Sequence, residues 1–269
     1  MKKQVFLAAL AVALISACGP KTPAPGTPAD AALAPAAVPL IPEDQVRLSN
    51  DPAKTELFRD IGLGLFIHWG PNSQMGTEIS WPLNGASDDY IRKYYALAET
   101  FDPVHFDPAE WARLAKLAGM EYVVFTAKHH DGFAMYDTAL SEWSAAKMGP
   151  KRDLIGDLAK AVRKEGLVFG LSSHRAEHYF FMNGGRKFDS DVQDPRYADF
   201  YGPAAPDGQA PDEAFLKDWL SRCTELVDKY KPQLFWFDWW IEQPEFKPYL
   251  QKFAAYYYNR GAYVAAANR

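Results

Sequence analysis

The sequence is short of cysteine, of basic residues and of long apolar runs, and each shortage excludes a class of protein. Its 269 residues include 29 Lys and Arg against 34 Asp and Glu, a formal net charge of −5, so it lacks the basic surface that nucleic-acid binding requires. Cys18 and Cys223 are the only cysteines, which excludes a framework of disulfides. Cys223 lies at helical spacing from Leu220 and Leu226, and this pattern predicts a buried thiol that fills apolar space.

A glycine-rich phosphate loop is missing as well. The first apolar run of the domain is followed by HWGPNSQMG, residues 68–76. This segment has neither the glycine spacing of a dinucleotide-binding turn nor the lysine of a P-loop. We therefore expect no nucleotide, and no other cofactor.

The amino terminus has the pattern of a secretory signal. Two lysines precede an apolar run from Val5 to Ile15, which is too short to span a bilayer. The small residues that lead to Cys18 resemble a bacterial lipobox, which predicts a lipoprotein signal peptide over residues 1–18 with Cys18 acylated. Cleavage near Ala17 as an ordinary signal peptide is the alternative. Gly19 favours the outer membrane, so we expect a lipid anchor and a place in the cell envelope, periplasmic or in the outer membrane.

Residues 19–42 are almost wholly Ala, Pro, Thr and Gly. Such a segment has no large apolar periodicity and cannot bury a core, so it is interpreted as an extended linker. The remaining residues, 43–269, are enough for one domain.

This domain repeats a strand followed by a helix. Short continuous apolar runs, which fit parallel strands buried on both faces, occur at Leu63–Trp69, Tyr122–Ala127, Leu167–Leu171, Leu234–Phe237 and Tyr263–Ala267. Strands that alternate with helical patterns at this spacing predict an α/β fold with a parallel sheet.

The helices between the runs begin and end at recognisable residues. Asp107 is a predicted N-cap, followed by Pro108. The apolar face of this helix is predicted at Trp111, Leu114, Ala115 and Ala118. Further helices are predicted from Asp153 to Gly166, over about 211–230 and over about 244–260. Asp88 and Asp89 are interpreted as a solvated turn.

A doubly wound sheet and a (β/α)8 barrel both fit this alternation. A polar or reactive side chain ends each apolar run: His68, His129 with His130, His174, Asp238 and Arg269. Functional residues at the carboxyl ends of several strands are typical of a TIM-barrel enzyme. Five strands are fewer than the eight of a closed barrel, so we expect an incomplete barrel with about five of eight β/α units, the product of a truncated gene or a fragment.

Three segments together resemble the retaining α-L-fucosidases of glycoside hydrolase family 29. They are LGLFIHWGP from residue 63, the stretch from Phe101 to Thr138 that contains KHHDGF, and LFWFDWW from residue 234. The resemblance runs from about Phe58 to the last residue.

The resemblance implies roles for several residues. Asp238 matches the catalytic nucleophile, and His68, His129 and His130 match histidines that hydrogen-bond the fucose hydroxyls. Trp236 matches a residue of the sugar pocket, and Glu78 and Trp81 resemble a Glu–Trp pair that touches the sugar. Arg269 matches an arginine near the sugar ring. The expected substrate-binding set is therefore His68, Glu78, Trp81, His129, His130, His174, Trp236 and Arg269.

Two features depart from the family pattern. Many members carry Tyr on the third strand, where this chain has SSHRAEH, so His174 is a candidate of its own. The family supplies its general acid/base, a Glu, from beyond Arg269, and its usual carboxyl-terminal β-sandwich is also absent here. Glu242 and Glu245 follow the fourth strand and are interpreted as solvated rather than as substitute acids.

A buried Asp238 among Trp and Phe suits a nucleophile, since an unpaired buried carboxylate is costly and has either a partner or a function. A structural carboxylate is the alternative. A zinc site at the adjacent histidines is a further alternative, but the first strand lacks the His-x-His of barrel metallohydrolases, and we expect no metal. The predicted activity is hydrolysis of terminal α-L-fucose from glycans; the alternatives are a fucose-binding lipoprotein and an inactive fragment. The oligomeric state is left open.

Overall fold

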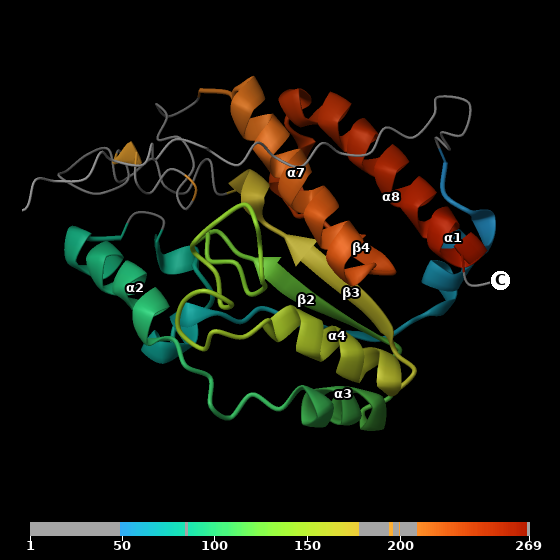
Figure 1. Cartoon of the computed structure of the whole chain (residues 1–269), viewed down its shortest axis with the longest axis horizontal. Coiled ribbons are helices and arrows are strands. Elements are labelled where there is room, and N and C mark those ends of the chain that lie inside the picture. Colours follow the sequence, from blue (N-terminus) through green and yellow to red (C-terminus); the bar gives the residue numbers. More distant parts are fainter. Residues whose placement is uncertain (1–48, 84–85, 178–193, 196–198, 200–208, 268–269) are drawn as a thin grey trace, which may run out of the picture. The chain divides into compact units, whose positions relative to one another are not determined.

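The computed structural model describes residues 49–83, 86–177, 194–195, 199 and 209–267. The predicted signal peptide and linker, with Cys18, lie outside these residues, as does Arg269. In the part that is described, a parallel sheet is flanked by helices (Figure 1). The predicted α/β class is confirmed.

The sheet contains four described strands in the order β1 (Gly64–Ile67), β2 (Tyr122–Lys128), β3 (Val168–Ser173) and β4 (Leu234–Trp236). Every neighbouring pair is parallel, with Phe125 opposite both Ile67 and Leu171 in register. Among the described residues β1 and β4 each pair on one side only, so the sheet does not close. This is the incomplete barrel that the sequence predicts.

The predicted strand at Tyr263–Ala267 is wrong, because these residues belong to the helix α8 (Lys247–Ala267). Short apolar runs fit both a strand and a buried helix. Three of the five residues are alanine, the best helix former. The fourth helix therefore runs past its predicted end near residue 260, and the described sheet has four strands rather than five.

The helices between the strands lie next to one another. α3 (Pro108–Leu117) contacts α4 (Leu154–Lys164), α4 contacts α7 (Glu213–Tyr230), and α7 contacts α8. Asp107, Asp153 and Asp212 cap the amino ends of α3, α4 and α7 with side-chain hydrogen bonds to backbone N–H groups. The caps predicted at Asp107 and Asp153 are confirmed.

The inward face of α3 differs from its prediction. Ala112 and Ala115 are buried, whereas Leu114 is 47% exposed. Trp111 is half-buried and packs edge-on against Trp69, with ring centroids 5.1 Å apart. Small alanine side chains let α3 approach α4 closely, which leaves the larger Leu114 on the outside.

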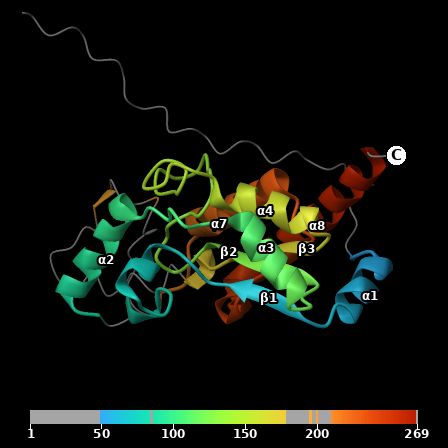
Figure 2. The same ribbon diagram turned by 90° about the horizontal axis from the view of Figure 1, so that it is seen from below.

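The helix α2 (Asp88–Thr100) replaces the solvated turn that was expected there. Ser87 caps it, and Asp88 and Asp89 occupy its first turn, where negative charge is favoured by the helix dipole. Its buried residues are Tyr94, Tyr95 and Ala98. Figures 1 and 2 place α2 at the end of the sheet to which the strands point, and α1 (Pro52–Asp60) at the opposite end.

Two apolar clusters hold these elements together. One joins the sheet to α2, α3 and α4. The other surrounds Trp219 of α7 and Phe246, the residue that precedes α8 in the sequence. Cys223 is fully buried in the second cluster, as predicted.

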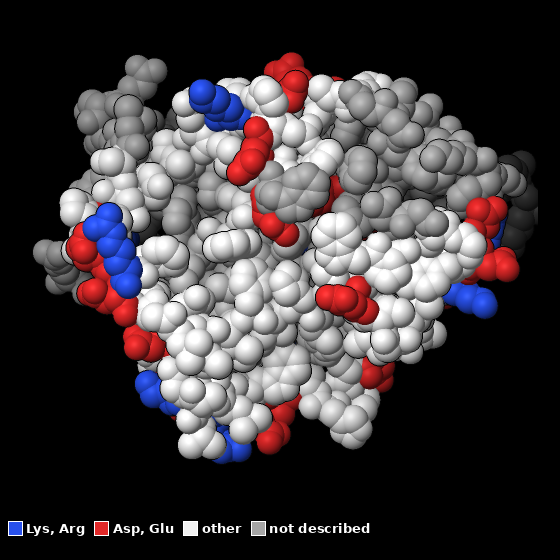
Figure 3. All heavy atoms as spheres, turned by 180° about the vertical axis from the view of Figure 1, so that it is seen from behind, with Lys and Arg blue, Asp and Glu red and all other residues white. Residues whose placement is uncertain are grey.

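None of the described helices combines the length and the apolar character needed to cross a membrane. On one face a broad area carries few charged side chains (Figure 3).

Candidate active site

The structure brings the histidines at the ends of three strands together. His68 follows β1, His129 and His130 follow β2, and His174 follows β3. Their ring centroids lie 5.4 Å apart for His68 and His129, 5.6 Å for His68 and His174, and 4.6 Å for His129 and His174. The ring of His130 lies 4.0 Å from that of His129. We call these four residues the histidine cluster.

Asp238 lies beside this cluster, two residues after β4. Its Oδ2 is 3.8 Å from Nδ1 of His174. Because side chains alternate between the faces of a strand, Phe235 and Phe237 pack toward the second apolar cluster. Trp236 and Asp238 face the other way, and Trp236 meets Phe66 edge-on at 5.9 Å. The ring of Phe237, which precedes Asp238, packs instead against Trp219 and Phe253 of the second apolar cluster.

The expected deep burial of Asp238 is wrong. Its side chain is 39% exposed, and Trp236 is 49% exposed. The aromatic residues on either side of Asp238 in sequence suggested an apolar surrounding, but alternation along the strand sends the two Phe side chains to the opposite face. Asp238 is therefore open to an incoming molecule.

Hydroxyl groups orient two of the histidines. Ser80 Oγ hydrogen-bonds Nδ1 of His129, and Thr126 Oγ1 lies 3.2 Å from Nδ1 of His68. Ser172 of β3 in turn donates a 3.0 Å hydrogen bond to Thr126 Oγ1. With Nδ1 engaged in this way, Nε2 is the nitrogen that His68 and His129 can offer to a ligand.

Burial keeps the histidine cluster uncharged at neutral pH. It lowers the pKa of His130 to about 2 and that of His174 to about 4, and neighbouring histidines add to the effect. The pKa values of His129 and His68 are also lowered, chiefly by burial, with Asp238 opposing the change at His68. A neutral imidazole offers one donor and one acceptor, which suits sugar hydroxyl groups.

Glu177 is a site residue that the sequence reasoning missed. It lies three residues after His174 on a helical turn and is 2% exposed. Burial, with a contribution from Asp238, raises its pKa to about 8, so it carries a proton at neutral pH. Its spacing from His174 was the available signal, because residues three apart on a helical turn share a face.

Asp131 and Tyr94 anchor the loop that carries His129 and His130. The hydroxyl of Tyr94 in α2 donates a 2.7 Å hydrogen bond to Asp131 Oδ2, and the N–H of Phe133 donates one of 3.0 Å to Oδ1. Burial raises the pKa of Asp131, and both hydrogen bonds oppose that rise. The HHDGF segment is thus fixed to a helix that the sequence reading took for a turn.

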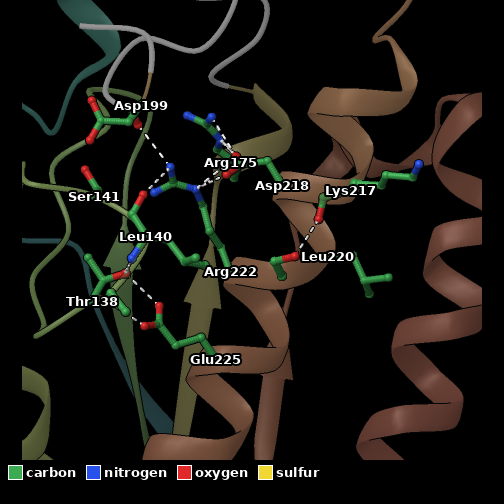
Figure 4. A network of polar contacts seen from close by, with 12 residues as sticks. Thr138, Leu140, Ser141, Arg175, Asp199, Lys217, Asp218, Leu220, Arg222 and Glu225 are labelled. Carbon is green, nitrogen blue, oxygen red and sulfur yellow. Dashed lines mark hydrogen bonds and ion pairs between the residues drawn. The ribbon is translucent and has the colours of Figure 1, made fainter. Parts of the chain in front are cut away.

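Two buried arginines share Asp218, whose side chain is 31% exposed, in an ion-pair network that holds the side chain after His174 (Figure 4). Arg175 Nη2 lies 2.7 Å from Asp218 Oδ2, and Arg222 Nε lies 2.9 Å from Asp218 Oδ1. Arg222 also donates 3.1 Å hydrogen bonds to the carbonyl oxygens of Leu140 and Asp199. Burial favours a raised pKa for Asp218, but the two guanidinium groups outweigh it and lower the pKa to about 2.

The remaining predicted site residues are placed less directly. Trp81 is 43% exposed and meets His130 edge-on, with ring centroids 5.3 Å apart. Glu78 is exposed and makes no hydrogen bond or ion pair within the described part of the chain. Arg269 is not among the described residues.

Among the described residues, two groups of side chains have donor atoms close enough to share a metal ion. They are His68, His129 and His174, and His130, His174 and Glu177, and in each group the donor atoms lie within 4.8 Å of one another. His174 belongs to both.

Comparison with known proteins gives a single family. The family model described as alpha-L-fucosidase matches residues 43–269. The tissue alpha-L-fucosidase of Rattus norvegicus is 32% identical over 222 residues, which cover 75% of this chain and 43% of that protein. The alpha-L-fucosidase of Branchiostoma floridae is 30% identical over 214 residues, 73% of this chain and 43% of that protein. The chain thus spans less than half the length of these relatives.

Solved structures agree with the sequence comparison. The Thermotoga maritima alpha-fucosidase in complex with a mechanism-based inhibitor superposes with a TM-score of 0.58 at 29% identity, covering 77% of this chain and 52% of that one. The same protein in complex with fucose gives a TM-score of 0.57 at 29% identity, with coverage of 77% and 51%.

Proposed function

The chain belongs to the alpha-L-fucosidase family, and from that premise we propose that it is a retaining exo-α-L-fucosidase. The proposed reaction removes terminal α-L-fucose from glycans through a covalent fucosyl–Asp238 intermediate. The observation that carries this proposal is the position of a half-exposed carboxylate 3.8 Å from His174, at the edge of a neutral histidine cluster.

Each part of this arrangement has a role in the proposed reaction. The carboxylate of Asp238 attacks the anomeric carbon, and the bond from that carbon to the leaving oxygen breaks. His68, His129 and His130 hold the sugar hydroxyls, and hydrogen bonds that strengthen in the transition state lower the barrier. A second carboxyl, roughly 5 Å from the first, protonates the leaving oxygen and then activates water. We assign this acid/base role to none of the described residues.

The test is release of nitrophenol from nitrophenyl α-L-fucoside, because this leaving group needs little help from an acid. We expect release from the unmodified chain and at least about a 10³-fold loss in Asp238→Ala, since the covalent step is removed. Glu242→Gln, at an exposed position just after Asp238, is the matched control and should keep the original rate. Fucose binding without any release would favour a fucose-binding lipoprotein instead.

We further propose that a lipid on Cys18 anchors the protein in the cell envelope. The basic start, the short apolar run and the small residues before Cys18 support this. The Cys18→Ala variant should move from the membrane fraction to the soluble fraction. An unchanged distribution would contradict the anchor.

A further inference from the structure

His68, His129 and His174 form a group of three nitrogen donors at the carboxyl ends of three neighbouring strands. Donor atoms of the three rings lie within 4.8 Å of one another. Three histidines that converge from separate strands form a common type of zinc site, in which the fourth position takes water or another ligand. Asp238, whose Oδ2 lies 3.8 Å from Nδ1 of His174, is a neighbouring carboxylate.

The surroundings of two rings match those of metal ligands in proteins. A ligating histidine usually hydrogen-bonds through its second nitrogen, which fixes the ring and its tautomer. Ser80 does this at Nδ1 of His129 and Thr126 at Nδ1 of His68, while Ser172 orients Thr126. Both rings therefore keep Nε2 available to a ligand.

His174 provides the third donor. Its side chain is 2% exposed, and neither ring nitrogen has a hydrogen-bond partner in the described part of the chain. Buried polar atoms are nearly always satisfied, so these two nitrogens have unused capacity for a ligand, a water or an ion. His68, in contrast, is exposed. An ion from solvent can therefore enter the group of three histidines at His68.

We propose that His68, His129 and His174 bind a divalent transition-metal ion of the zinc class, and that the bound ion excludes the sugar from the site. Imidazole nitrogen suits Zn²⁺, Cu²⁺ and Ni²⁺, whereas Mg²⁺ and Ca²⁺ prefer oxygen. The ion acts as an inhibitor rather than a cofactor, because it occupies ring nitrogens assigned to the sugar and draws the Asp238 carboxylate toward itself. The exclusion of sugar rests on the proposed function; the binding of the ion does not.

The second group, His130, His174 and Glu177, is the competing assignment. All three of its members are buried, so it lacks an exposed ligand through which an ion can enter. The two groups share His174 and differ in their other two members. Replacing His68 or Glu177 therefore distinguishes them.

The experiment is calorimetric titration of the metal-free full-length chain with Zn²⁺ alone, in a buffer that does not chelate it. We expect one ion per chain, and binding at least about 100-fold weaker in His68→Gln and in His174→Gln, since the loss of an outer-shell partner alone costs about 10–100-fold. Glu177→Gln should keep the original affinity, and so should His105→Gln, at an exposed position before α3. The unfolding temperature of each variant without metal checks its fold. If His174→Gln does not fold, the zinc affinity of His68→Gln still tests the assignment, because His68 is exposed and its replacement should not disturb the fold.

Competition between fucose and Zn²⁺ provides a second test of the proposal. Fucose added at saturation should weaken Zn²⁺ binding, and Ca²⁺ should produce no heat. Zinc affinity that survives in His68→Gln, or that falls only in Glu177→Gln, would overturn the assignment. The metal-free chain could also bind Zn²⁺ as expected and release no nitrophenol. That result would support the metal site and refute only the proposed function.

Discussion

Protonation at the site is set by burial, and it acts in opposite directions on the histidines and on Glu177. The histidines lose their charge at neutral pH, because burial lowers the pKa of His130 to about 2 and that of His174 to about 4. Glu177 keeps its proton, because burial raises its pKa to about 8. At pH 7 Asp238 therefore faces neutral neighbours from β2 and β3, which can donate hydrogen bonds to a sugar without forming ion pairs with the carboxylate.

Glu177 should make stability depend on pH. Its folded pKa of about 8 lies above its ordinary value of 4.5, so the folded chain retains a proton that the unfolded chain releases between these values. The resulting stabilisation is complete below pH 4.5 and is lost as the pH rises to 8. The difference in unfolding free energy between the original chain and Glu177→Gln should fall by about 1.4 kcal/mol per pH unit in this window.

Urea unfolding of both proteins at several pH values measures this difference. The histidines contribute equally to both proteins, so their own loss of stability below pH 6.5 cancels in the comparison. A difference that does not change from pH 5 to pH 8 would show that Glu177 is ionised when folded.

For individual residues, the sequence predicts contacts between side chains more accurately than it predicts the exposure of those side chains. Polar residues at successive strand ends had to meet at one edge of a parallel sheet, and His68, His129, His130, His174 and Asp238 do. The exposure of Asp238 was mispredicted, because the run LFWFDWW hides the alternation that separates Trp236 and Asp238 from their Phe neighbours. Glu177 was missed because its role depends on burial, which no local pattern reports.

At the element scale, α7 links the site to the rest of the domain. Its Asp218 binds Arg175, the residue after His174, and its Arg222 binds the backbone of the segment after β2. Glu225, one turn further along α7, accepts hydrogen bonds from Thr138 Oγ1 at 2.6 Å and from the N–H of Ala139 at 2.8 Å. One face of α7 therefore positions the segment Thr138–Leu140 and the side chain of Arg175, the residue after His174 (Figure 4).

Asp218→Asn should destabilise the protein strongly. The change leaves Arg175, whose side chain is 3% exposed, and Arg222 with only a neutral partner at this position, and breaking a buried ion pair costs about 3–5 kcal/mol. Glu213→Gln removes a pair on the same helix in which Lys217 and Glu213 are 66% and 73% exposed, and it should leave the unfolding transition unchanged.

Chemical denaturation of the two variants gives the comparison. Equal effects would mean that the Arg175–Asp218–Arg222 network is as solvated as a surface pair. The pKa of Asp218, lowered to about 2, adds a check: the stabilisation it provides should persist above its ordinary value of 3.8 and disappear as the pH falls toward 2.

Elements with explicit end signals were the ones that the sequence predicted. Asp107, Asp153 and the glycine at 166, whose φ is +74°, mark helix boundaries where they were expected. α2 was missed because Asp88 and Asp89 fit both a turn and a first helical turn, and the decisive fact is the burial of Tyr94 and Tyr95 by distant residues. The segment 263–267 was misassigned because its apolar composition fits both a strand and a helix.

At the scale of the whole molecule, the described sheet ends in two unpaired strands. β1 and β4 each have a neighbour on one side only among the described residues. Beside β4 lies a largely apolar groove of about 600 Å³ lined by residues of α1, β4 and α8, among them Phe58, Phe253 and Tyr257. Phe58 and Leu57 of α1 are 53% and 47% exposed. Unpaired edges and exposed apolar surface favour association with other chains.

The chain of 269 residues should therefore self-associate at micromolar concentration. Sedimentation velocity at increasing concentration is expected to show a rising average mass. Phe58→Glu, which places a charge beside the groove, should shift the distribution toward monomer, while Val104→Glu, at a position 73% exposed away from it, should not. A monomer at every concentration would mean that the open edges are covered within the chain itself.

The fold class followed from the sequence at this scale, and the number of strands did not. Continuous apolar runs separated by capped helices specify parallel strands with helical crossovers. Whether a final apolar run adds a strand depends on a neighbour with which it can pair, and that information lies outside the run itself.

The identity of the nucleophile is tested most directly by trapping it. The chain is incubated with a fluorinated fucosyl inhibitor that forms a stable ester with the attacking carboxylate, and the labelled peptide is then sequenced by mass spectrometry. We expect one fucosyl group per chain, attached to Asp238 and absent from Asp238→Ala. A label on another side chain, such as Glu177 or Glu242, or a chain that binds fucose yet remains unlabelled, would contradict it.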